Sequence, residues 1–166
     1  MIKQGKAWKF GDDISTDHIA PGRLFHLRTN LPELAKHVLE DADPEFAQKM
    51  SVGDFVVAGN NFGLGSSREH APQVLKIAGV NAVLAKSFAR IFFRNAINIG
   101  LLLVECNTDM INQGDELELD LAAGIIKNKT QATKIKATPL PDVMIKILND
   151  GGLAKHIEKY GDFQLV

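Results

Sequence analysis

Residues Asn61–Pro72 read NFGLGSSREHAP and lie between two segments with patterns of regular secondary structure. The apolar, β-branched run Phe55–Ala58 leads into it, and a helix-like segment, Gln73–Ala78, leads out of it. This order of strand, glycine-rich loop and helix puts two glycines, two serine hydroxyls and the guanidinium of Arg68 at a helix N-terminus. Free backbone N–H groups and the helix dipole favour an anion there. The stretch predicts half of a carboxylate-binding site that also supplies a serine base.

Two other interpretations of the loop compete with this one. Ser66 with Glu69 three residues later is a capping box, which is a structural role. Pro72 counts against it, because a helix capped at Ser66 would carry a proline in its second turn, whereas a helix that begins near Glu69 leaves both serines free. Nucleotide binding is the other alternative, but no lysine follows the glycines and the spacing is not the dinucleotide fingerprint. Arg68 instead offers a planar fork suited to a carboxylate.

The remaining pattern predicts an α/β chain with a parallel sheet, followed by a small antiparallel meander. Residues 24–30 are expected to form an irregular loop. We expect one domain over residues 1–166. The predicted strands are residues 6–10, 54–59, 80–86, 101–105, 116–121, 125–127 and 134–137, and the predicted helices are residues 31–39, 44–47, 73–78, 88–98, 141–148 and 153–160.

Composition limits the possible functions. The chain has 166 residues, 45% hydrophobic content and a formal net charge of −1, so nothing in it indicates a general nucleic-acid or membrane-surface binder. Its one cysteine, Cys106, excludes an intrachain disulfide and a cluster held by several cysteines of this chain, and it fits a small core residue. The N-terminus lacks the apolar core of a signal peptide, and no apolar window approaches the roughly 18 residues of a membrane span. We expect a cytoplasmic protein.

Polar side chains also gather in two other places. Ser15–His18 places small polar groups between isoleucines, and its structural alternative is a simple Asx or Ser/Thr turn. Arg90 and Arg94 lie four residues apart, which is typical of a solvated helix face. Asn95 and Asn98 could cap loops or line a site.

Three segments of the chain resemble the aconitase/isopropylmalate isomerase family, specifically its mobile C-terminal swivel domain. They are DISTDHI at Asp13–Ile19, NFGLGSSREHA at Asn61–Ala71 and AKSFARIFFRNAINIG at Ala85–Gly100. The similarity runs from about Gly5 to Asp162 and implies a swivelling three-layer β/β/α domain with a mainly parallel central sheet. The length implies that the swivel domain is a separate polypeptide, a small subunit.

The resemblance also implies an activity, that of an iron–sulfur hydro-lyase. A [4Fe–4S] cluster would be carried by a large catalytic subunit, and this chain would bind no metal. Ser66 would be the base that removes the proton α to a carboxylate, and Ser67 and Arg68 would bind substrate carboxylate. Asp17 would lie in or directly beside the catalytic site.

Substrate choice in this family is associated with the loop after the first segment, here residues 23–29. Leu24, Phe25 or Leu27 could line a pocket for the isopropyl group of isopropylmalate, whereas Arg28 could bind the additional carboxylate of homoaconitate or could be a solvent-exposed charge. A dimethylmalate-type substrate is a third alternative. Leu64 stands where many relatives have cysteine, and it removes no catalytic group. A non-catalytic anion-binding module is the alternative from a different class.

Overall fold

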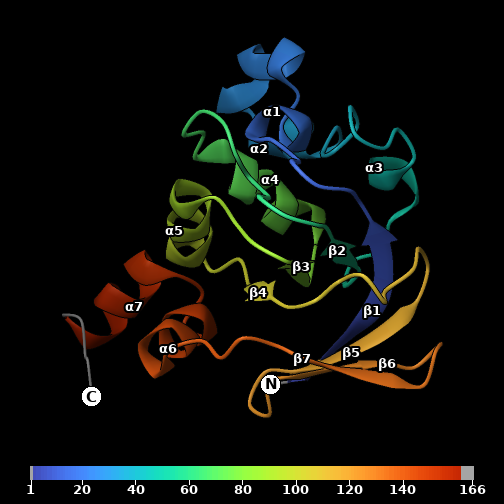
Figure 1. Cartoon of the computed structure of the whole chain (residues 1–166). Coiled ribbons are helices and arrows are strands. Elements are labelled where there is room, and N and C mark those ends of the chain that lie inside the picture. The colour runs from blue at the N-terminus through green and yellow to red at the C-terminus, as the bar shows by residue number, and fades with distance from the viewer. Residues whose placement is uncertain (1, 162–166) are drawn as a thin grey trace.

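The computed structural model of this chain describes residues 2–161, and within them seven strands form one curled sheet in the order β4-β3-β2-β1-β5-β6-β7 (Figure 1). The pairings among β1, β2, β3 and β4 are parallel. The pairings of β1 with β5, β5 with β6 and β6 with β7 are antiparallel. Strand β1 belongs to both halves, because residues 7–9 pair with β2 and residues 2–6 pair with β5. The strands are β1 Ile2–Lys9, β2 Phe55–Val57, β3 Ala82–Ala85, β4 Leu103–Glu105, β5 Glu116–Asp120, β6 Ile125–Asn128 and β7 Thr133–Lys136.

Most helices lie close to the predicted ranges, but the helix predicted over residues 31–39 ends at Ala35, and a short helix over Thr16–Ile19 was not predicted. Residues 24–30 differ, because most of this expected loop belongs to a 3-10 helix, η1, over Gly22–Thr29. Periodicity gave no sign of η1, since none of its residues is buried. The other helices are α1 Thr16–Ile19, α2 Leu31–Ala35, α3 Phe46–Lys49, α4 His70–Ala78, α5 Arg90–Ile99, α6 Asp142–Asn149 and α7 Leu153–Tyr160.

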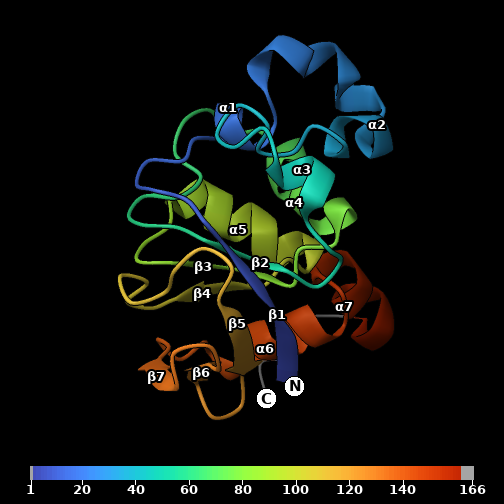
Figure 2. The ribbon, with the colours of Figure 1, turned by 90° about the vertical axis from the view of Figure 1, so that its right-hand side faces the viewer.

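Both faces of the parallel sheet are covered, which explains why its strands read as continuous apolar runs. Val56 and Val83 point into a core shared with α4 and α5, while Phe55 and Leu84 point into a second core shared with β5, β6 and α6. Figure 2 shows α5 on one side of β3 and β4, and the β5–β7 meander with α6 on the other. The predicted α/β class and three-layer β/β/α arrangement are therefore confirmed. The single domain and its swivelling motion remain predictions.

Candidate active site

Three loops that are distant in the sequence meet at one edge of the parallel sheet. They follow β1, β2 and β3, and isolated parallel bridges join Ser15 to Leu64 and Phe62 to Phe88 beyond the ends of the strands. Carboxyl ends of parallel strands share an edge, and open sheets usually bind ligands there. The three segments on which the family resemblance rests are therefore parts of one structure.

Two glycines let the loop after β2 pass close to its neighbours. Gly63 and Gly65 have left-handed backbone, with φ of 85° and 105°, a conformation that costs other residues about 1–2 kcal/mol. At Gly63 a Cβ atom would lie 2.2 Å from Cγ of Phe92 in α5. The loop thus packs directly against α5, and this contact fixes the position of Ser66 and Ser67 beyond the edge of the sheet.

Helix α4 begins at His70 and has Glu69 as its N-cap residue. Pro72 is the third helical residue, where its missing N–H needs no intrahelical partner. Ser66 and Ser67 precede the helix and are exposed. The helix start that Pro72 predicts is confirmed, and a capping box at Ser66 is excluded.

Arg68 contacts two of the predicted site residues. Its Nε donates a hydrogen bond to Oγ of Ser66 at 3.0 Å, and its Nη2 forms an ion pair with Oδ1 of Asp17 at 2.6 Å. The Asp17 side chain is 61% exposed, whereas that of Arg68 is 21% exposed. Nη1 of Arg68 is buried and donates to no partner among residues 2–161, so its N–H groups are available to an acceptor. The structure brings Ser66, Arg68 and Asp17 into one chain of contacts.

The segment Ser15–His18 combines a structural and a positioning role. Ser15 caps α1 by accepting a hydrogen bond from N–H of His18, and Nδ1 of His18 accepts one from N–H of Ser15, so the local-turn interpretation is right for these two residues. Buried Thr16 donates its hydroxyl hydrogen to the carbonyl oxygen of Ser66 at 3.1 Å. No role for Thr16 was predicted from the sequence. The available signal was its place between two other polar residues, Ser15 and Asp17. Only Asp17 turns from this segment toward Arg68.

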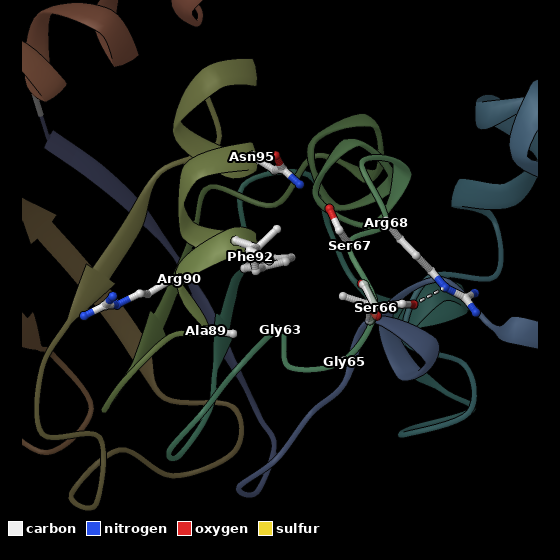
Figure 3. Close-up of a pocket in the computed structure, with 11 residues that line it drawn as sticks. Gly63, Gly65, Ser66, Ser67, Arg68, Ala89, Arg90, Phe92 and Asn95 are labelled. Atoms are coloured by element: carbon white, nitrogen blue, oxygen red, sulfur yellow. Dashed lines mark hydrogen bonds between the residues drawn. The ribbon is translucent and has the colours of Figure 1, made fainter.

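A cleft of about 210 Å³ lies between the glycine loop and α5. Ser66, Ser67 and Arg68 form one wall, and Thr16 and Asn95 also line the cleft. Figure 3 shows Asn95 on α5 and the Ser67 hydroxyl facing each other, while the Arg90 side chain points away from the loop. Of the two roles that the sequence allows for Asn95, the structure favours the lining role, and Arg90 borders the same cleft while it stays exposed.

Phe25 and Arg28 of η1 approach the site from the other side of Arg68. The guanidinium carbon of Arg28 lies 4.2 Å from the centre of the Phe25 ring, and that of Arg68 lies 5.5 Å from it. The His70 ring contacts Phe25 edge-on at 6.1 Å between centroids. Burial, followed by the charges of Arg68 and Arg28, lowers the pKa of His70. Arg28 is not part of the cleft wall, and its Nη1 donates to the carbonyl oxygen of Phe25 at 3.2 Å.

Residues suited to holding a metal do not gather within the described part of the chain. Between residues 2 and 161, no three His, Cys, Asp or Glu side chains are placed to bind one ion. Cys106 is buried, and burial raises the pKa of its thiol to about 12. None of the helices in the same range is long and apolar enough to cross a membrane.

Known proteins share the sequence and the fold of this chain. The model of the aconitase C-terminal domain family matches residues 20–109. The 3-isopropylmalate dehydratase small subunit 2 of Archaeoglobus fulgidus is 63% identical over 165 residues, covering 99% of this chain and 100% of that relative. Small subunit 1 of the Thermotoga maritima enzyme is 59% identical and covers 100% of both chains. A crystal structure of 3-isopropylmalate dehydratase from Methanocaldococcus jannaschii superimposes with a TM-score of 0.93 at 45% identity, covering 97% of this chain and 96% of that one.

Proposed function

The chain belongs to the aconitase C-terminal domain family, and from this membership we propose that it is the small subunit of a 3-isopropylmalate dehydratase. This hydro-lyase of leucine biosynthesis moves a hydroxyl group between neighbouring carbons of isopropylmalate by dehydration and rehydration. Relatives with this name span nearly the whole chain. The roles of the individual site residues are the finer part of the proposal.

Ser66 acts as the base. In dehydration its alkoxide takes the proton α to a substrate carboxylate, and in rehydration its hydroxyl returns the proton to the carbon that lost the hydroxyl group. The observation that carries this role is the 3.0 Å hydrogen bond from Nε of Arg68 to Oγ of Ser66. A fixed donor to an oxygen that must become negative typically supplies about 3 kcal/mol in comparable sites. Ser66 is also exposed on the wall of the cleft, which gives substrate access to it.

Ser67 and Arg68 bind a substrate carboxylate beside this base. Arg68 has donors left after its contacts to Ser66 and Asp17, and Ser67 faces the same cleft. Asp17 holds the guanidinium in place through Nη2, so a carboxylate bound by the other donors lies next to Ser66. This arrangement orients the acidic C–H of the substrate toward the serine oxygen.

The large subunit carries the iron–sulfur cluster in this proposal. When bound, such a cluster supplies Lewis-acid activation of the substrate hydroxyl. Cysteine thiolates hold clusters of this kind, and a lone buried thiol with a raised pKa does not fit that role, so this chain's residues are not its ligands. The contribution of this chain is carboxylate binding and proton transfer, and turnover requires both subunits.

Contacts in η1 bear on the choice of substrate. Leu24 and Leu27 pack against the core, so of the three apolar candidates only Phe25, with 46% of its surface exposed, can reach a substrate isopropyl group. Arg28 lies beside the same ring and supports homoaconitate as the second candidate, because a second cation suits an additional carboxylate. Isopropylmalate stays the first choice because of the relatives' names.

The test is turnover by the complex assembled from this chain and a cluster-bearing large subunit. We expect the complex to dehydrate isopropylmalate, and the absorbance of the unsaturated product measures this reaction. Ser66→Ala should abolish turnover while the complex still assembles, whereas the neighbouring Ser67→Ala should mainly raise KM. Unchanged turnover in Ser66→Ala would disprove the assignment of the base. Arg28→Val is assayed with isopropylmalate and with homoaconitate. It should impair turnover of homoaconitate alone if Arg28 binds the additional carboxylate.

A further inference from the structure

We propose that Phe25 is a positioning residue for substrate carboxylates, acting through the guanidinium of Arg68. The inference rests on the proposed function and adds a residue outside the three signature segments. Two polar contacts fix Arg68. The ion pair with Asp17 and the hydrogen bond to Ser66 engage Nη2 and Nε, which lie in the guanidinium plane. Contacts in the plane set its direction but leave its tilt free.

The Phe25 ring supplies the contact that limits the tilt. The Arg68 guanidinium carbon lies 5.5 Å from the ring centre, within the range in which the ring quadrupole attracts a cation. His70, the first residue of α4, meets the same ring edge-on, so the ring touches both the arginine and the helix that follows it. Arg68 is thereby held from three directions, while its Nη1 stays without a protein acceptor in the described chain.

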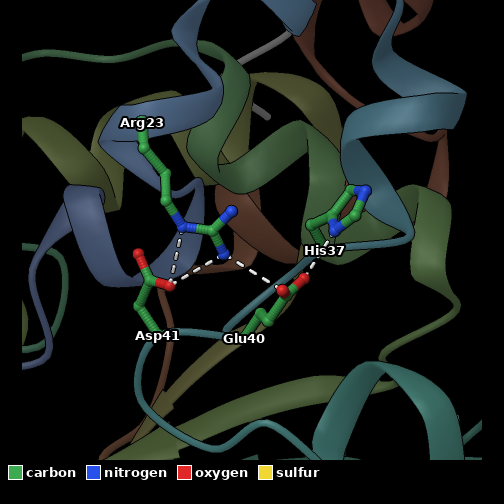
Figure 4. A network of polar contacts seen from close by, with 4 residues as sticks. All are labelled: Arg23, His37, Glu40 and Asp41. Carbon is green, nitrogen blue, oxygen red and sulfur yellow. Dashed lines mark hydrogen bonds and ion pairs between the residues drawn. The ribbon is translucent and has the colours of Figure 1, made fainter.

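Phe25 can hold Arg68 only if η1 is itself fixed, and a charged network does this. Figure 4 shows Arg23, near the start of η1, reaching the turn after α2, where it meets Glu40 and Asp41. Nη2 of Arg23 lies 3.0 Å from Oε1 of Glu40 and 3.0 Å from Oδ1 of Asp41. Because η1 has no buried residue, this anchor and the partly buried Leu24 and Leu27 determine where the Phe25 ring lies.

A second cation uses the same ring. The guanidinium carbon of Arg28 lies 4.2 Å from the ring centre of Phe25. Two guanidinium groups repel each other, and a shared aromatic ring offsets part of that repulsion. Loss of the ring should therefore move both cations, and it should weaken binding of any substrate that carries carboxylates, whatever its side chain.

The experiment separates this role from a direct contact with the isopropyl group. Phe25→Leu keeps apolar bulk but removes the ring, and Phe25→Tyr restores the ring. In the complete two-subunit enzyme, hydration of isopropylmaleate is compared with hydration of citraconate, which has a methyl group in place of the isopropyl group. We expect Phe25→Leu to raise KM about fivefold for both substrates with a smaller change in kcat, and Phe25→Tyr to stay close to the parent. Met110→Ala, at another exposed apolar side chain, serves as the control.

A second measurement on the free chain does not depend on activity. The Nε–H proton of Arg68 should shift in the NMR spectrum when the ring is removed in Phe25→Leu and should return in Phe25→Tyr. A KM change for isopropylmaleate alone would assign Phe25 to the isopropyl group and overturn the proposal. Equal KM values in the two variants, or an unchanged Arg68 resonance, would also overturn it. If the parent complex hydrates neither substrate, the proposed function fails, and the Arg68 resonance still decides whether Phe25 positions this arginine.

Discussion

Replacing Gly63 by alanine tests whether the glycine loop is held by direct contact with α5. In the structure a Cβ atom at this position would lie 2.2 Å from Cγ and 2.6 Å from Cβ of Phe92. Both contacts are far inside van der Waals separation. Phe92 is itself 3% exposed and packed in the core, so it cannot turn away without opening space around it. Gly65 provides the matched control, because its nearest neighbour would be the Thr16 hydroxyl at 3.3 Å.

The expected magnitudes follow from two separate costs. A left-handed backbone costs a residue with a Cβ about 1–2 kcal/mol, and this applies to both glycines. Overpacking of a core adds about 1–3 kcal/mol, and this applies only to Gly63. Gly63→Ala should therefore lose about 2–5 kcal/mol of unfolding free energy and Gly65→Ala about 1–2 kcal/mol. For a chain of this size, the corresponding decreases in Tm are about 10 °C and about 5 °C.

Urea unfolding of the free chain, followed by circular dichroism, measures both variants. The midpoint concentration should fall in each, more in Gly63→Ala, at an unchanged slope m. In the assembled enzyme, Gly65→Ala should also lower kcat, because this glycine directly precedes Ser66. Equal destabilisation by the two substitutions would show that the contact with α5 contributes nothing beyond backbone strain. Contact with α5 would then not be what positions the loop.

Two further predictions concern charges in the site. Asp17→Asn should lower kcat/KM about tenfold, because the guanidinium of Arg68 loses the partner that directs it, while stability changes by less than about 1 kcal/mol, as expected for an exposed pair. Asp109→Asn, which breaks the ion pair with Lys86 outside the cleft, should leave kinetics unchanged, and equal kinetics in the two variants would refute a role for Asp17. The lowered pKa of His70 means that this side chain binds a proton more readily in the unfolded chain than in the folded chain. The contribution of His70 to the free energy of unfolding is therefore present at neutral pH and is lost as pH falls below about 6.5. Urea midpoints at about pH 7.5 and about pH 5.5 should therefore differ less in His70→Gln than in the parent chain, and an equal difference would contradict the shift.

The main elements were predictable because the two cores leave clear apolar patterns in the sequence, continuous runs in the parallel strands and helical spacing in the helices. Val56 and Phe55 face opposite cores, and the continuous apolar runs of β2, β3 and β4 follow from that double burial. The free serines were predictable for a local reason as well, because Pro72 limits where α4 can begin. In these places the local sequence pattern carries the information.

The approach of η1 to Arg68 had no such signal. A 3-10 helix without buried residues has no apolar period to detect, and Arg23 pairs with Glu40 and Asp41, which lie 17 and 18 residues later in the chain, beyond α2. The sequence predicts Phe25 as a side chain that lines an isopropyl pocket. A phenylalanine that binds cations on its ring face and one that lines an apolar pocket have the same sequence signal. The distances to Arg68 and Arg28 separate the two roles, because a wall needs no guanidinium within 6 Å of its centre, which is about the limit of cation–π attraction. Loss of the aromatic face is therefore expected to lower affinity for the carboxylates of every substrate alike, and specificity for the substrate side chain should stay unchanged.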